Sequence, residues 1–319
     1  MAKLFLHITL LCVVVVSTCF LLWKWTLNSQ LAQENHNGWA AIIDKHHRLD
    51  SLHSPKLVLV GGSNVMFGLN SRLLSDSLHI PVVNMGLGGA LGLSFFLNEV
   101  KSSLHQGDIV LVSVEHYLDK GDYDAQLFTA NLYPPAQQYI HYKSELDSLT
   151  TNWSYRLRKI RNKIILPTSS SEAHTIADTT AVYFREAFDK QGDMVSHVNN
   201  RKPSELDDRS EMQATDYSKA IKKLNDFANF ATQKGVRVFF SYPSYAKQEA
   251  DRNQEALRQL DKQLRMQLHF PCIDSPFEQV YDDSLFFDTV YHLSDQGRTI
   301  RTLRVIQSLK KALNSTLTY

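Results

Sequence analysis

The chain has 319 residues, with 34 lysines and arginines against 33 aspartates and glutamates. This length suits one large α/β domain or two small ones, and the near-neutral charge gives no electrostatic case for a nucleic-acid partner. The cysteines provide neither a disulfide framework nor a zinc cluster, because two of the three fall in an apolar N-terminal segment. We expect neither a cofactor nor a bound metal.

That apolar segment covers residues 4–23 and carries no formal charge unless His7 is protonated. Its length matches a bilayer-spanning helix, and Trp23 and Trp25 are typical of the aromatic residues found at membrane interfaces. A cleaved signal peptide is the alternative, but its apolar core is usually shorter and is followed by small residues. The sequence therefore predicts an uncleaved transmembrane anchor over residues 1–25.

The orientation of this anchor is weakly specified, because Lys3 and Lys24 flank it almost symmetrically. A short N-terminal tail most simply stays inside the cell. We therefore expect a single-pass membrane protein whose globular domain is extracytoplasmic, in the periplasm or at the cell surface. A cytoplasm-facing domain on the same anchor is the alternative.

Residues 26–54 are polar with scattered apolar positions, a pattern that predicts a juxtamembrane helix and linker. Apolar runs and amphipathic stretches then alternate over residues 55–319, which predicts an α/β domain with a parallel sheet. Five strands are expected at the short apolar runs 57–60, 81–85, 109–114, 236–240 and 272–274. Helices are expected at 70–78, 91–104, 216–234, 246–267 and 294–313.

The stretch from about residue 118 to 214 breaks this rhythm, since it is rich in Tyr, Asn, Ser and charged residues. We expect an insertion that is helical at 137–165 and covers the carboxyl edge of the sheet. It contains the loop-forming run Pro167-Thr168-Ser169-Ser170-Ser171. A disordered segment is the alternative, which the many aromatic residues argue against.

Ser63 stands directly after the first expected strand, in the run Gly61-Gly62-Ser63-Asn64. A serine on such a turn reaches the carboxyl edge of the sheet, where open α/β folds bind ligands and place nucleophiles. The same run is also ordinary turn and helix-capping chemistry. What favours a nucleophile is the late pair Asp288 and His292, which would complete a Ser-His-Asp site.

In that site Ser63 is the nucleophile, His292 is the base that takes its proton, and Asp288 orients the imidazole. The oxyanion of the intermediate would be bound by backbone N–H groups of Ser63 and of Gly86 or Gly88. The side-chain amide of Asn64 is a further expected donor.

Glu115 and His116 follow the third expected strand and so face the same edge of the sheet. Either could replace Asp288 or His292 as the partner of Ser63. A metal site on His116 and His292 is a weaker alternative, because no spaced cluster of ligands accompanies them.

The placement of Ser63, Asp288 and His292 resembles that of the SGNH/GDSL hydrolase superfamily, over about residues 55–120 and 215–315. That superfamily has a flavodoxin-like, three-layer α/β/α fold with a five-stranded parallel sheet. Its nucleophilic serine follows the first strand, and its Asp/His pair precedes the last helix. The resemblance implies the same fold here and a chemistry of ester bonds.

Three features depart from the pattern of that superfamily. Gly62 stands where Asp usually precedes the serine, and His292 follows Asp288 by four residues rather than three. The third strand leads into Glu115 and His116 instead of a Gly-x-Asn-Asp motif, whose asparagine normally helps to bind the oxyanion. The layout of anchor, serine and late Asp/His pair is similar to bacterial membrane-anchored proteins of cell-surface polymer modification, among them the D-alanine transfer protein of the teichoic-acid pathway and the alginate acetylation proteins.

The leading hypothesis is a membrane-anchored serine esterase or O-acyltransferase that acts on acyl esters of cell-surface glycans, with a membrane acyltransferase as a partner. The second hypothesis is a catalytically inactive SGNH-like protein that binds glycan or scaffolds a cell-envelope biosynthetic complex. A nucleotide or phosphate binder is the third, but no Gly-x-x-x-x-Gly-Lys pattern supports it.

Overall fold

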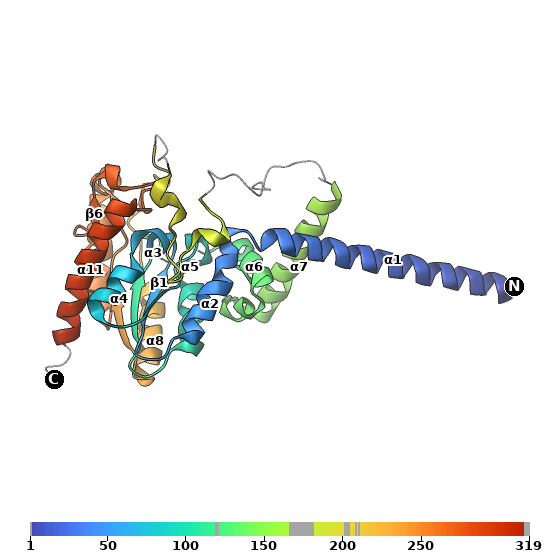
Figure 1. Ribbon diagram of the computed structural model, residues 1–319, viewed down its shortest axis with the longest axis horizontal. Helices are drawn as coiled ribbons and strands as arrows, with labels where there is room; N and C mark the ends of the chain where they lie inside the picture. The colour runs from blue at the N-terminus through green and yellow to red at the C-terminus, as the bar shows by residue number, and fades with distance from the viewer. Residues whose placement is uncertain are drawn as a thin grey trace.

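A computed structural model describes residues 2–118, 121–165, 182–200, 205–207, 209 and 211–315, and the side chains of residues 2, 19, 22–34 and 159–165 lie outside this description. The expected run from Pro167 to Ser171 also lies outside the described residues. Figure 1 shows the arrangement of helices and strands.

Four parallel strands form the central sheet in the order β2-β1-β3-β4. They are β1 (Leu57–Gly61), β2 (Val82–Asn84), β3 (Ile109–Ser113) and β4 (Arg237–Phe240). Leu57 pairs with Val82 on one side and with Ile109 on the other. Because the strand order reverses at β1, the carboxyl ends of β1 and β3 flank the switch point where open α/β sheets bind their ligands.

The expected fifth strand does not form among the described residues. Cys272 makes an isolated parallel bridge to Phe240, with N–H donation from Phe240 to Pro271 O at 2.9 Å and from Ile273 to Phe240 O at 2.9 Å. Beyond β4, the N–H of Tyr242 is the next donor that could extend this pairing. It donates to the side-chain Oδ1 of Asp274 at 2.9 Å and not to a backbone carbonyl. The side chain therefore replaces the backbone ladder, and the prediction of five strands was wrong.

A second, two-stranded parallel sheet pairs β5 (Tyr245–Ala246) with β6 (Val280–Tyr281). It lies in the part of the chain that follows β4. Its apolar side chains pack with Phe286, Val290 and Leu293 in a separate core cluster. This cluster supports the loop that carries Asp288 and His292.

Helices cover both faces of the main sheet, because alternate strand residues point to opposite sides. One face packs on α2 (Ala41–Ser51), α5 (Gly92–Val100) and α8 (Ser218–Gln233). The other packs on α3 (Ser63–Gly68), α4 (Ser71–Leu78) and α11 (Asp295–Ser315), which Figure 1 places beside one another. The result is a three-layer α/β arrangement.

Two expected helices differ in detail from the structure. The stretch 246–267 divides into α9 (Lys247–Arg252) and α10 (Gln254–Gln267). The stretch 26–54, expected to be a juxtamembrane helix and linker, contains α2, whose Ile42 and Leu49 are fully buried in the main core. The packed domain therefore begins before residue 55.

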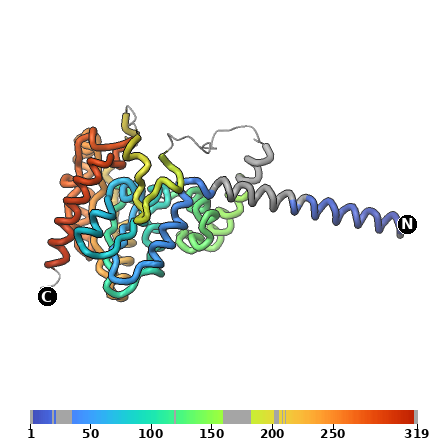
Figure 2. The backbone as a smooth tube through the Cα atoms, in the orientation of Figure 1, coloured from blue at the N-terminus to red at the C-terminus, as the bar shows by residue number. Residues whose placement is uncertain are grey.

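The region between β3 and α8 contains α6 (Tyr123–Leu132) and α7 (Glu145–Ile165). Residues 182–200 then run along the domain near α2 and α3, as Figure 2 shows in yellow. The N–H of Met194 donates to Met66 O at 3.0 Å, which fixes this segment against α3. We call residues 182–200 the strap.

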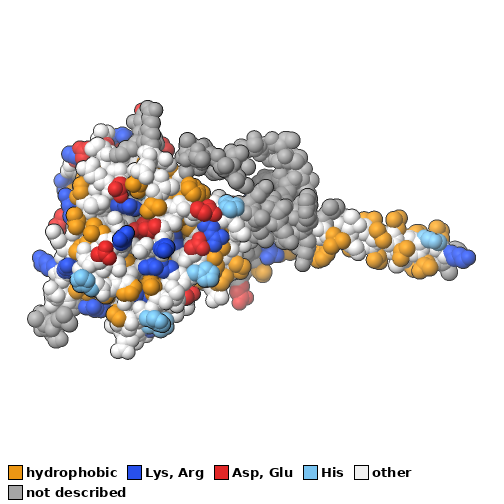
Figure 3. All heavy atoms as spheres, viewed as in Figure 1, with side chains coloured by type: hydrophobic (Ala, Val, Ile, Leu, Met, Phe, Trp, Pro, Cys, Tyr) orange, Lys and Arg blue, Asp and Glu red, His pale blue; other side chains and the backbone are white. Residues whose placement is uncertain are grey.

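The first helix, α1, runs from Ala2 to Glu34. Its described apolar side chains between Leu4 and Leu21 are exposed, as the orange spheres on this helix in Figure 3 show. Within the described part of the chain, no helix combines the length and the apolar character needed to cross a membrane. The transmembrane anchor predicted over residues 1–25 is therefore not supported, and the side chains of Trp23 and Trp25 lie outside the description.

Candidate active site

Two glycines bring Ser63 to the switch point of the sheet. A Cβ atom on Gly61 would lie 1.8 Å from the carbonyl oxygen of Ser113, and one on Gly62 would lie 2.3 Å from a carboxylate oxygen of Glu115. Only glycine allows the end of β1 to approach β3 so closely. The chain then turns into α3, whose first residue is the half-buried Ser63.

Glu115 is the direct hydrogen-bond partner of Ser63. The Ser63 hydroxyl donates to Glu115 Oε1 at 3.2 Å, and the N–H of Asn64 donates to the same oxygen at 3.0 Å. The Glu115 side chain is almost completely buried at the end of β3. Of the two alternative partners that the sequence suggested after the third strand, Glu115 is thus the one in contact with Ser63.

His116, the other alternative, belongs to a different environment. Its Nδ1 lies 3.3 Å from the hydroxyl of Tyr291, and its ring meets the ring of Tyr245 edge to face at 4.6 Å. Burial lowers the pKa of His116 to about 3. A neutral, packed imidazole of this kind supports the second sheet rather than Ser63.

Asp288 and His292 form a bonded pair. His292 Nδ1 lies 2.8 Å from Asp288 Oδ1, which gives the imidazole a fixed orientation. Burial by itself raises the pKa of Asp288, but hydrogen bonds from His292 and Tyr183 and the charge of His292 outweigh it and bring the pKa below its ordinary value. Asp288 is therefore an ionised acceptor at neutral pH.

Tyr183 on the strap joins this pair. Its hydroxyl donates to Asp288 Oδ2 and lies 3.3 Å from His292 Nδ1. No sequence motif points to Tyr183, which lies 105 residues before Asp288 in the region without a recognisable pattern. Only the folded position of the strap brings it to the site.

Phe67 connects the Asp288–His292 pair to the helix that carries Ser63. The rings of Phe67 and His292 are stacked, with 4.1 Å between centroids and 6° between planes. Residues four apart on a helix lie on the same side, so Phe67 sits one turn from Ser63. The serine and the histidine thus share one site, although no hydrogen bond joins them in the described structure.

The free atom of His292 is the one that general acid–base chemistry needs. Nδ1 is held by Asp288, whereas Nε2 has no hydrogen-bond partner among the described residues. The Nε2 atom is also not fully buried. Nε2 is therefore the ring nitrogen open to a substrate.

The side chain of Asn64 is held by hydrogen bonds to Ser113 on β3. Its side-chain amide donates to Ser113 O at 3.1 Å, and its Oδ1 accepts from Ser113 Oγ at 3.1 Å. The fully buried Arg301 donates to Asn64 O at 2.8 Å and also to Ser113 Oγ and Tyr242 O. The Asn64 side chain, expected to bind an oxyanion, is thus engaged by Ser113 at the end of β3.

The two expected glycine donors differ in availability. The N–H of Gly86 donates to Asn84 Oδ1 at 2.9 Å. Gly88 lies under Trp39, whose ring would be 2.4 Å from a Cβ atom at this position. No described residue accepts from the N–H of Gly88 or of Ser63, so these two are the candidate oxyanion donors.

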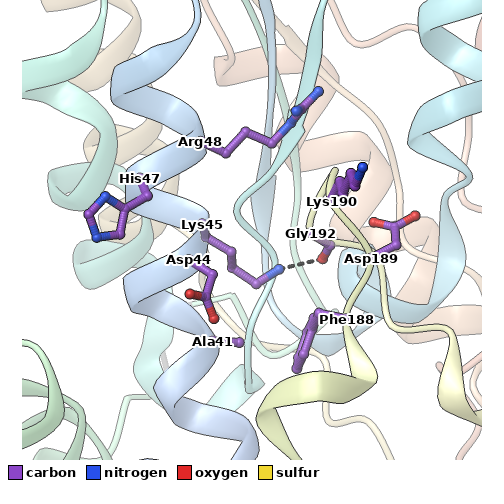
Figure 4. A pocket seen from close by; sticks show the side chains of 9 residues that line it. All are labelled: Ala41, Asp44, Lys45, His47, Arg48, Phe188, Asp189, Lys190 and Gly192. Atoms are coloured by element: carbon purple, nitrogen blue, oxygen red, sulfur yellow. Dashed lines mark hydrogen bonds between the residues drawn. The ribbon is translucent and has the colours of Figure 1, made fainter.

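A pocket of about 360 Å³ lies between α2 and the strap. Figure 4 shows Lys45 donating across it to Gly192 O, and burial lowers the pKa of Lys45 to about 8. The pocket contains none of the residues of the Ser63 site. In the described part of the chain, no cluster of His, Cys, Asp and Glu side chains could hold a metal ion.

No family model and no curated protein matches the chain. Among solved structures, the chain is similar to protein YxiM from Bacillus subtilis, with 10% sequence identity and a TM-score of 0.36, over 82% of this chain and 57% of that one.

Proposed function

We propose that the protein is a serine esterase or O-acyltransferase that acts on acyl esters. The observation that supports this best is the Asp288–His292 pair, which is bonded at 2.8 Å and stacked on Phe67, one helical turn from Ser63. Acyl transfer through a serine needs acid–base groups beside the nucleophile, and an imidazole oriented by a carboxylate is one such group. Esters of cell-surface glycans are the proposed substrates, on the resemblance of motifs described above.

In the proposed reaction, Ser63 Oγ gives its proton to a neighbouring base and attacks the acyl carbonyl, and the covalent acyl-enzyme forms as the bond to the alcohol oxygen of the ester breaks. The N–H groups of Ser63 and Gly88 stabilise the negative charge on the carbonyl oxygen. His292, through Nε2, exchanges a proton with the leaving or the incoming oxygen, and Asp288 stabilises the imidazolium. Water resolves the acyl-enzyme in an esterase, and a sugar hydroxyl does so in a transferase.

The test is labelling with a fluorophosphonate probe together with hydrolysis of p-nitrophenyl acetate. The wild-type protein should react with both, and Ser63→Ala should react with neither. Asp288→Asn should slow ester hydrolysis by at least tenfold, since the imidazole loses its orientation. Asp251→Asn, a change at an exposed carboxylate on α9, is the matched control and should keep the wild-type rate.

A second candidate function is binding without catalysis. One observation favours it: the Ser63 hydroxyl bonds Glu115 rather than His292, and the Asn64 amide is engaged by Ser113. A protein of this kind would bind a glycan at the same edge of the sheet. Absence of probe labelling and of ester turnover in the folded wild-type protein would support this candidate over the first.

A further inference from the structure

We propose that Glu115, and not His292, takes the proton of Ser63 when the serine attacks, and that His292 serves the leaving and incoming oxygens. This inference rests on the proposed function and divides the acid–base work of the same site between two groups. It makes Glu115 a catalytic residue, because its carboxylate touches the reacting oxygen.

Glu115 is in direct contact with the hydroxyl of Ser63. Glu115 Oε1 is the acceptor to which the Ser63 hydroxyl donates, at 3.2 Å. A general base must lie within hydrogen-bond reach of the proton that it removes. In the described structure Glu115 meets this condition and His292 does not, so the nucleophile already has a base before any movement.

Glycine residues line the space that the Glu115 carboxylate occupies. Gly62 has no side chain to occupy this space. A Cβ atom at this position would lie 2.3 and 2.5 Å from the two carboxylate oxygens of Glu115. On another side the carboxylate is close to Gly89, where a Cβ atom would lie in ordinary van der Waals contact with Glu115 Cδ, at 3.4 Å. The carboxylate is therefore packed in one position against Ser63 and Asn64.

The buried Glu115 carboxylate is accompanied by a hydrogen-bond donor and a positive charge. A buried carboxylate is expensive unless donors and a counter-charge accompany it. Glu115 receives the Asn64 N–H, and the buried guanidinium of Arg301 is close enough to interact with it electrostatically. Arg301 is itself fixed to Asn64 O at 2.8 Å. The site therefore holds a positioned base with a positioned cation behind it.

The position of His292 fits the complementary role. Asp288 and Tyr183 hold its Nδ1 side, and the Phe67 ring supports one face of the imidazole. The remaining Nε2 has no partner among the described residues. An imidazolium at this place can donate a proton to a departing oxygen without moving Ser63.

The proposed reaction has two halves, in which the acyl-enzyme forms and is then resolved. Ser63 Oγ forms a bond to the carbonyl carbon, its proton passes to Glu115, and the carbonyl π electrons move to the oxygen. The intermediate collapses as the bond to the leaving oxygen breaks, and that oxygen takes the proton of His292 Nε2. In the second half, Nε2 accepts the proton of the incoming hydroxyl, and Ser63 Oγ departs with the proton from Glu115.

The test compares reactions that differ in their need for a proton donor. Fluoride leaves a fluorophosphonate with little help from an acid, whereas ethoxide leaves ethyl acetate only when protonated. We expect Glu115→Gln to lower the fluorophosphonate labelling rate about a hundredfold, within the range for loss of a general base. His292→Asn should label within about tenfold of wild type but lose hydrolysis of ethyl acetate.

Controls and contrary outcomes separate this inference from the proposed function. Glu255→Gln, at an exposed carboxylate on α10, should label at the wild-type rate. Wild-type labelling by Glu115→Gln, or loss of labelling by His292→Asn, overturns the division of roles while Ser63 remains the nucleophile. If Glu115→Gln does not fold, Glu115→Asp decides: its shorter carboxylate should slow labelling at least tenfold, and an unchanged rate overturns the proposal. No labelling of the wild-type protein contradicts the proposed function itself.

Discussion

The imidazole of His292 lies flat on the phenyl ring of Phe67, with 4.1 Å between the ring centroids. Phe67 belongs to the short helix that Ser63 begins, whereas His292 belongs to a loop before the last helix. The stack therefore fixes the distance between two segments that are far apart in the sequence. It also connects the candidate nucleophile with the candidate acid–base pair.

Replacing Phe67 should separate stability from activity. Phe67→Leu and Phe95→Leu each remove a buried ring, and each should lower the free energy of unfolding by about 1–3 kcal/mol. Only Phe67→Leu removes the support of His292, so only this variant should lower ethyl acetate turnover by tenfold or more. Chemical denaturation and turnover measured side by side test this, and equal losses of activity in both variants would contradict the role of the stack.

Gly62→Ala should displace the Glu115 carboxylate while it lowers the stability of the fold only a little. The new methyl group would lie 2.3 Å from a carboxylate oxygen, which is the far end of a side chain and not backbone. We expect the carboxylate to move away from Ser63, with a loss of less than about 2 kcal/mol in stability and a clear loss of probe labelling. A variant that labels as fast as wild type would show that the contact between Glu115 and Ser63 is dispensable.

Tyr183→Phe tests the contribution of the strap. The variant removes the hydroxyl that donates to Asp288 Oδ2, one of the groups that lower the pKa of this carboxylate. The pKa of Asp288 should rise, so the acid limb of the pH–rate profile should begin at a higher pH. Tyr142→Phe, whose hydroxyl bonds Gln137 and Asn152 in the region between β3 and α8, is the control that should leave the profile unchanged.

Asp274 predicts a dependence of stability on pH. Its burial raises the pKa to about 6, so the folded protein favours the protonated form. The stability that this group contributes is fully present below its unfolded pKa of about 3.9 and is lost as the pH rises through 6. Between pH 4 and 6.5, the unfolding free energy of wild type should fall relative to Asp274→Asn by at most roughly 3 kcal/mol. Urea titrations of both proteins measure this difference, and parallel pH profiles would contradict it.

Much of the fold follows from local sequence patterns. Apolar runs predicted the four strands of the main sheet within about two residues at each end, and Gly235 ends α8 with a left-handed φ of +73°. The four-residue spacing of Asp288 and His292 permits the two side chains to meet, and they lie 2.8 Å apart. Short-range chemistry determines each of these features.

The features that the sequence did not predict depend on contacts across the fold. Asp274 ends the expected fifth strand because its carboxylate bonds the N–H of Tyr242, and no apolar pattern reveals that competition. Tyr183 reaches the site only through the position of the strap. Glu115 was identified solely as an alternative, since its contact with Ser63 depends on the space above Gly62.

The proposed reaction requires that Ser63 carries the acyl group. The most direct measurement is mass spectrometry of the protein quenched in acid during turnover of p-nitrophenyl acetate, followed by peptide mapping. The peptide that contains Ser63 should carry one acetyl group in the wild-type protein and none in Ser63→Ala. An acetyl group that maps to another residue, or undiminished acetylation and turnover in Ser63→Ala, would contradict the proposed reaction.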